Sequence, residues 1–143
     1  MILYYILVPL AWLVFHIGFR VRCEGRENLK KIGTKGCIIA PNHISAIDPV
    51  FVVLARFWGK KMLILAKEEL FKNPLAGWFL RCMGAVAIER GRGDTTTVEQ
   101  LTNECKNGTG IMIFPEGTRS KTGEVAEFKA GAFKIAQKNL SLI

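Results

Sequence analysis

The chain has 143 residues, half of them hydrophobic, which suits a single domain with a core and excludes a disordered or low-complexity protein. Its 20 Lys and Arg against 12 Asp and Glu give a net charge of +8, which favours anionic partners such as phospholipid headgroups or phosphorylated substrates. Nucleic acid is disfavoured as a partner, because the sequence contains no motif for groove docking or base stacking.

The first nineteen residues, MILYYILVPLAWLVFHIGF, contain no acidic residue, Lys or Arg. Their length is borderline for a spanning helix, and Pro9 and His16 disfavour a straight one. A cleaved signal peptide fits less well, because no basic residue precedes the apolar run and no small-residue cleavage site follows it. We therefore expect residues 1–22 to form a membrane-associating helical segment, spanning the bilayer or lying in its surface, with a buried core helix as the alternative. The arginines of the RVR stretch that follows predict attachment at the cytoplasmic face, as on the inner membrane of a cell.

From residue 23 onward, short apolar runs alternate with helical patterns. The short runs predict strands at 37–40, 62–66, 85–88 and 111–114. Longer apolar or amphipathic stretches predict helices at 49–57, 74–84, 94–107 and 127–140. Strands separated by helices predict an α/β fold, in which helices cover both faces of a central mixed, mostly parallel sheet.

The four cysteines, Cys23, Cys37, Cys82 and Cys105, lie far apart and form no C-x-x-C pair. This spacing argues against a thiol redox motif and against a zinc site. We expect Cys37, Cys82 and Cys105 to be small buried hydrophobic residues.

A polar cluster, PNHISAIDP, follows the first predicted strand and contains His43 and Asp48. Ligands collect beyond the strand ends of such sheets. A neutral imidazole accepts a proton from a hydroxyl near pH 7, and a carboxylate on its other nitrogen holds it in one tautomer. The same spacing also occurs by chance in surface turns, so the pair alone leaves both interpretations open.

A second cluster, FPEGTRS, follows the last predicted strand. Gly117 allows backbone N–H groups to approach a ligand, Thr118 offers a hydroxyl, and Arg119 offers a planar fork for phosphate oxygens. A solvated polar turn explains this composition equally well. Lys67 and Arg90 also stand at predicted strand ends, where basic side chains are commonly just solvated.

Three motifs in this order, NHISAID, KEELFKNPLAGWFLRCMGAVAIER and FPEGTRS, resemble the glycerolipid acyltransferases of the 1-acylglycerol-3-phosphate acyltransferase (PlsC) type. The resemblance runs from about Cys37 to Ala136. It implies that His43 is the general base toward the acceptor hydroxyl and that Asp48 orients it. It also implies a set of acceptor-phosphate residues: Lys67, Arg90, Glu116, Gly117, Thr118 and Arg119.

The resemblance implies transfer of a fatty acyl group to the sn-2 hydroxyl of 1-acylglycerol-3-phosphate, which gives phosphatidic acid in phospholipid biosynthesis. The implied partners are the lipid acceptor, an acyl donor (acyl-CoA or acyl-ACP, the acyl carrier protein thioester) and a membrane surface with anionic lipids. Acyl thioester is a co-substrate, and no cofactor or metal is implied. Two alternatives stay open: a different lysolipid acceptor, and a non-catalytic domain that binds anionic lipid at the membrane surface.

The sequence departs from the family pattern at one point. The family usually has a fourth, proline-containing strand segment after the helix that corresponds to residues 127–140, whereas this sequence stops at LSLI. We therefore expect residues 23–143 to be an acyltransferase domain truncated at its C-terminal end.

Overall fold

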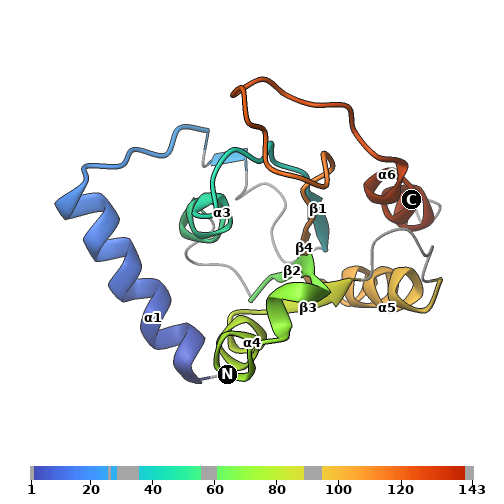
Figure 1. The fold of residues 1–143 in the computed structure, drawn as a ribbon, viewed down its shortest axis with the longest axis horizontal. Helices are drawn as coiled ribbons and strands as arrows, with labels where there is room; N and C mark the ends of the chain where they lie inside the picture. Colours follow the sequence, from blue (N-terminus) through green and yellow to red (C-terminus); the bar gives the residue numbers. More distant parts are fainter. Residues whose placement is uncertain (1, 26, 29–35, 56–60, 89–94, 141–143) are drawn as a thin grey trace.

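A four-stranded parallel sheet lies at the centre of the computed structural model, which describes residues 2–25, 27–28, 36–55, 61–88 and 95–140 (Figure 1). Its strands are β1 (Cys37–Ile39), β2 (Leu63–Lys67), β3 (Ala85–Ile88) and β4 (Gly110–Met112). The spatial order is β1-β4-β2-β3, and each described pairing is parallel. The predicted α/β class with a mostly parallel sheet is therefore confirmed.

Helices precede, separate and follow the strands, as the sequence pattern predicts. They are α1 (Ile2–Leu13), α3 (Asp48–Ala55), α4 (Pro74–Cys82), α5 (Thr95–Lys106) and α6 (Ala130–Leu140). A π-helical turn, η1 (Val14–Gly18), continues α1, and a short 3-10 helix, η2 (Glu68–Phe71), links β2 to α4. The sequence did not predict η2, because four residues are too few to show a helical period. Asp94, the predicted cap of the third helix, lies outside the described residues.

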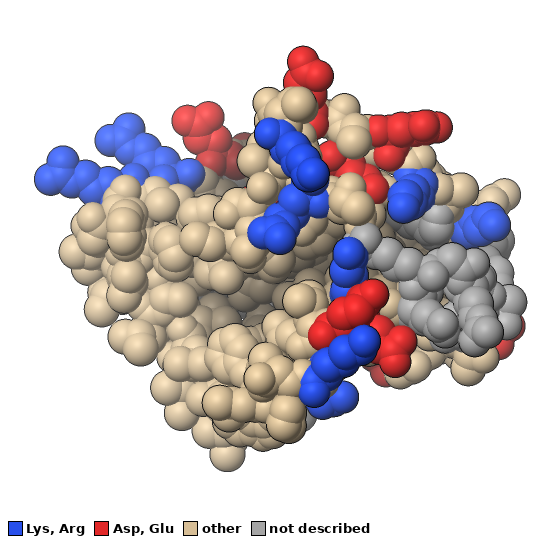
Figure 2. All heavy atoms as spheres, viewed as in Figure 1, with Lys and Arg blue, Asp and Glu red and all other residues tan. Residues whose placement is uncertain are grey.

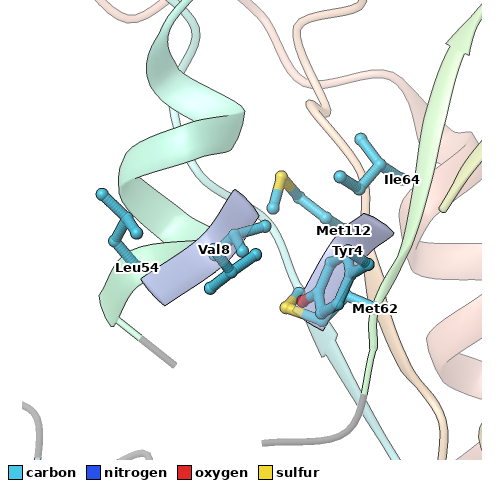
Figure 3. Close-up of a cluster of buried hydrophobic side chains, with 7 residues drawn as sticks. Tyr4, Val8, Leu54, Met62, Ile64 and Met112 are labelled. Atoms are coloured by element: carbon cyan, nitrogen blue, oxygen red, sulfur yellow. The ribbon is translucent and has the colours of Figure 1, made fainter. Parts of the chain in front are cut away.

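Side chains of the strands alternate between two hydrophobic clusters, because successive residues of a strand point to opposite faces of the sheet. On one face, Ile64 and Met112 pack with residues of α1 and α3 (Figure 3). On the other face, Ile111 and Ile113 pack with residues of α5 and α6. Helices therefore cover both faces of the sheet, as the sequence predicts.

The N-terminal helix α1 is apolar around its whole circumference. Tyr4 and Val8 belong to the first hydrophobic cluster, whereas Ile2, Ile6 and Leu10 are exposed. α1 therefore contributes to the core through one side and presents a second apolar side to its surroundings. Among the helices that the structure describes, none combines the length and the apolar character that crossing a bilayer requires.

α4 begins and ends at residues that suit those places. The Asn73 side chain accepts hydrogen bonds from the N–H groups of Leu75 and Ala76, both at 3.0 Å, and so caps the helix start. After its end, Gly84 has a φ of +95°, and a Cβ there would lie 2.2 Å from the Met62 carbonyl oxygen. Only glycine fits this turn into β3 without displacing the backbone.

Candidate active site

The two polar clusters of the sequence lie side by side because β1 and β4 are neighbours in the sheet. The Ile113 N–H donates to the Ile39 carbonyl at 3.0 Å and continues their pairing beyond β4. Further along, the Ser120 N–H donates to the His43 carbonyl at 2.7 Å. The loop after β1 and the loop after β4 therefore meet at the carboxyl edge of the sheet (Figure 1).

His43 and Asp48 form a hydrogen-bonded pair. The turn between β1 and α3 places Asp48 at the start of α3, where its Oδ2 lies 2.9 Å from the His43 Nδ1. The same oxygen accepts hydrogen bonds from the backbone N–H groups of Ile44 and Ser45, each at 2.7 Å. A carboxylate acceptor at Nδ1 places the ring proton there and leaves Nε2 as a proton acceptor.

The electrostatics of Asp48 favour its ionised form. Burial alone would raise the pKa of this carboxyl group, because a desolvated charge is costly. The hydrogen bonds from His43, Ser45 and Ile44, together with attraction to the His43 ring, outweigh burial and lower the pKa of Asp48 below its ordinary value. Asp48 is therefore an anion at neutral pH, as the orienting partner of a general base must be.

The His43 ring is also held by an aromatic contact. It stacks on Phe114 with ring centroids 4.0 Å apart and planes inclined by 26°. The side chain remains 18% exposed, which leaves the site open to a ligand. The sequence offered no reason to assign a role to Phe114, because the residue is the last one of the strand predicted at 111–114 and so is expected to pack in the core.

Glu116 differs from the rest of its motif because its side chain is buried, with 3% of the residue exposed. Its Oε1 accepts the His43 N–H at 2.7 Å, and its Oε2 accepts the Ala126 N–H at 3.0 Å. Gly117 follows with a φ of +71°, a left-handed conformation that glycine adopts without strain. The loop reverses at this point, because the Gly117 N–H donates to the Phe114 carbonyl at 3.0 Å.

Thr118 and Arg119 are exposed beside the buried carboxylate. Lys67 is the last residue of β2, is also exposed, and stands at the same carboxyl edge of the sheet. Arg90 lies outside the described residues. Lys129 is a further cation that the sequence did not indicate, because it falls within the helix predicted at 127–140 and in neither polar cluster; in the structure it directly precedes α6.

The Lys129 side chain is folded over Gly117. A Cβ built on Gly117 would lie 3.2 Å from the Lys129 Cδ, Cε and Nζ atoms. The backbone of Lys129 is tied to the same loop, because its N–H donates to the Pro115 carbonyl at 2.9 Å. Its ammonium group is therefore near the motif that the sequence associates with phosphate.

Together these groups combine a proton acceptor with a cationic loop. An imidazole held in one tautomer can deprotonate a hydroxyl, and the neighbouring Arg and Lys side chains suit a phosphate on the same molecule. Within the described ranges, no three His, Cys, Asp or Glu side chains converge as metal ligands.

Comparisons with known proteins found similarity to acyltransferases. The family model for acyltransferases matches residues 20–142. The chloroplastic 1-acyl-sn-glycerol-3-phosphate acyltransferase of Arabidopsis thaliana is 34% identical over 122 residues, covering 84% of this chain and 33% of the relative. The 1-acyl-sn-glycerol-3-phosphate acyltransferase of Saccharomyces cerevisiae is 35% identical over 127 residues, covering 85% of this chain and 40% of the relative.

The chain thus spans between a third and two fifths of the length of these curated relatives. Among solved structures, the 1-acyl-sn-glycerophosphate acyltransferase PlsC from Thermotoga maritima is 25% identical with a TM-score of 0.48, covering 96% of this chain and 68% of that one.

Proposed function

Since the chain belongs to the acyltransferase family, we propose that it transfers a fatty acyl group from an acyl thioester to the sn-2 hydroxyl of 1-acylglycerol-3-phosphate, forming phosphatidic acid. The donor is acyl-CoA or acyl-ACP. The observation that carries the proposal is the Nδ1–Oδ2 hydrogen bond of 2.9 Å between His43 and Asp48, directly beside the cationic loop after β4. The names of the relatives support the choice of acceptor.

The reaction needs no covalent enzyme intermediate. The His43 Nε2 takes the proton of the acceptor hydroxyl while the hydroxyl oxygen attacks the thioester carbonyl carbon. The C–S bond then breaks, and the departing thiolate receives a proton from the imidazolium. Asp48 stabilises that imidazolium through Nδ1, and a thiolate is a good leaving group, so base catalysis and positioning supply most of the rate.

The acceptor phosphate is assigned to the loop after β4. Arg119 has a fork geometry that matches two phosphate oxygens, and Thr118 adds a hydroxyl donor. Lys67 and Arg90 are assigned as further cations. A phosphate bound at this loop would hold the glycerol hydroxyl near His43, because the His43 carbonyl is bonded to Ser120 of the same loop.

We place the protein at the cytoplasmic face of a membrane, with α1 and α4 toward the lipid. α4 exposes three large apolar side chains on one side, Leu75, Trp78 and Phe79, and Leu75 is 74% exposed. Figure 2 shows that the left and lower parts of the molecule, where α1 and α4 lie, carry almost no charged side chains. Basic and acidic side chains both border this surface, and the basic ones suit anionic headgroups.

Membrane attachment is tested by sedimentation with vesicles of neutral and anionic lipids. The double substitution Leu75→Ser with Trp78→Ser should weaken vesicle binding several-fold, because it removes two exposed apolar contacts. Val125→Ser is the matched control, since Val125 is 62% exposed but stands on the loop before α6. Equal vesicle binding by the double variant and the control would show that α4 does not contact the lipid.

The enzymatic proposal is tested with a panel of lysolipid acceptors and a defined acyl-CoA or acyl-ACP, with products identified by mass spectrometry. The wild-type chain should acylate 1-acylglycerol-3-phosphate, and His43→Ala should reduce this rate by about a thousandfold while keeping the fold. If the chain acylated another lysolipid faster, that lysolipid would be the acceptor in place of 1-acylglycerol-3-phosphate. Vesicle binding without turnover would overturn the enzymatic proposal in favour of a lipid-binding domain.

A further inference from the structure

The buried carboxylate of Glu116 has no opening toward a ligand. Its residue is 3% exposed, and each of its oxygens accepts a backbone N–H, from His43 on one side and Ala126 on the other. A carboxylate in direct contact with a phosphate would also repel it. The family resemblance counts Glu116 among the phosphate-binding residues, but these contacts suit a different role.

Glu116 belongs to the cationic loop after β4, and its side chain connects this loop to the backbone of His43. The main chain of His43 is held at both polar groups by the segment 116–120, because its N–H donates to Glu116 and its carbonyl accepts from Ser120. Both bonds are 2.7 Å long. A shift of the loop after β4 is therefore transmitted to the backbone that carries the imidazole.

The second oxygen of Glu116 holds the chain segment that returns toward α6. The Ala126 N–H donates to Oε2, and three residues later the Lys129 N–H donates to the Pro115 carbonyl. These two bonds frame the segment against the loop and bring the Lys129 side chain over Gly117. Lys129 is exposed and free to meet a ligand from solvent or lipid.

We propose that Glu116 is a positioning residue that holds His43 and Lys129 at a set distance from the loop after β4, and that Lys129 is a further cation for the acceptor phosphate. The proposal rests on the proposed acyl transfer. In this proposal the hydrogen bonds of Glu116 to the His43 and Ala126 N–H groups form a rigid frame. This frame fixes the distance between the base for the acceptor hydroxyl and the cation for the acceptor phosphate. Charge-assisted hydrogen bonds to backbone N–H groups are strong enough to maintain such a frame.

The test of Glu116 is Glu116→Gln in the full chain. The amide keeps the size of the side chain, but its NH₂ group faces a backbone N–H and cannot accept a hydrogen bond from it. We expect kcat to fall roughly tenfold and the acceptor KM to rise several-fold, with the donor KM unchanged. Glu116→Asp keeps the charge with a shorter reach and should show an intermediate effect, which provides a second folded variant. Glu124→Gln, an exposed carboxylate eight positions further along the chain, is the control.

The test of Lys129 is Lys129→Met, with the exposed Lys121→Met as its control. The acceptor KM should rise about threefold with kcat retained, as expected for one partly solvated cation. Lys129→Arg should restore the wild-type acceptor KM. An unchanged acceptor KM in Lys129→Met would remove Lys129 from the phosphate site.

A purely structural role for Glu116 gives a different result. It would lower the rate only in proportion to the folded fraction, which circular dichroism measures, and would leave the acceptor KM unchanged. That outcome would overturn the proposal for Glu116.

A binding measurement distinguishes failure of this proposal from failure of the proposed acyl transfer. If the wild-type chain acylates no acceptor, calorimetric titration with a soluble short-chain lysophosphatidate compares Glu116→Gln and Lys129→Met with the two controls. Weaker binding by both variants would support the positioning role of Glu116 and the phosphate contact of Lys129 even if the chain does not transfer acyl groups. Binding equal to that of the controls, or no binding by the wild type, would overturn both.

Discussion

Replacing Asp48 by Asn tests the His–Asp pair most directly. Asp48 Oδ2 accepts three hydrogen bonds, from His43 Nδ1 at 2.9 Å and from the Ile44 and Ser45 N–H groups at 2.7 Å. An amide oxygen can still accept some of these bonds, but without charge. Since a hydrogen bond to a charged group contributes about 1.5–3 kcal/mol and a neutral one about 1 kcal/mol, the substitution should cost roughly 2 kcal/mol of stability.

The kinetic effect should be larger than the effect on stability. The amide NH₂ group can donate to Nδ1, which moves the ring proton to Nε2 and removes the proton acceptor. We expect kcat for acyl transfer to fall by about a thousandfold, with the acceptor KM within a few-fold of wild type. Radiolabelled acyl transfer at saturating donor measures both parameters. If Asp48→Asn kept more than a tenth of the wild-type kcat, the general-base assignment would be wrong.

The same variant makes a signed prediction for pH. Because the pKa of Asp48 is lowered in the folded protein, its ionised form stabilises the fold fully above the ordinary Asp value of about 4. This stabilisation is lost as pH falls through the lowered pKa. The difference in melting temperature between wild type and Asp48→Asn should therefore shrink as pH falls below about 4. A difference that persists unchanged at about pH 2 would contradict the lowered pKa.

Three further predictions concern other parts of the chain. Arg119→Lys should raise the acceptor KM about tenfold with kcat within about twofold, because Lys keeps the charge but loses the fork; equal KM values would contradict bidentate binding. In urea denaturation, Gly84→Ala should cost at least about 3 kcal/mol, because its Cβ would meet the Met62 carbonyl, whereas Gly123→Ala, also at positive φ but in open space, should cost about 1–2 kcal/mol. Burial, with a smaller contribution from Cys37, raises the pKa of the Cys105 thiol. Maleimide at about pH 8 should therefore label Cys105 at least tenfold more slowly than the exposed Cys23. Equal labelling rates would show that Cys105 is at the surface.

The alternation of short apolar runs with helical patterns predicted the strands and helices to within a few residues. This succeeded because both faces of a parallel sheet are buried, so that its strands appear as apolar runs bounded by polar turns. The strand at 85–88 was predicted with the bounds that the structure shows. The spatial order β1-β4-β2-β3 could not be predicted from the sequence pattern, because pairing between distant strands leaves no local periodicity.

Within the candidate site, the sequence by itself determined which residue types are present: His43 and Asp48 five positions apart, and a Gly-Thr-Arg turn after the last strand. Local spacing allowed Asp48 to fold back on the imidazole, because both residues belong to one strand-to-helix turn, but it left a plain surface turn equally open. Only the tertiary structure decided that Phe114 stacks on His43, that Glu116 turns inward to two backbone N–H groups, and that Lys129 covers Gly117. These contacts join segments up to 73 positions apart in the chain. They exist because β1 and β4 are adjacent, and that adjacency is a property of the assembled sheet.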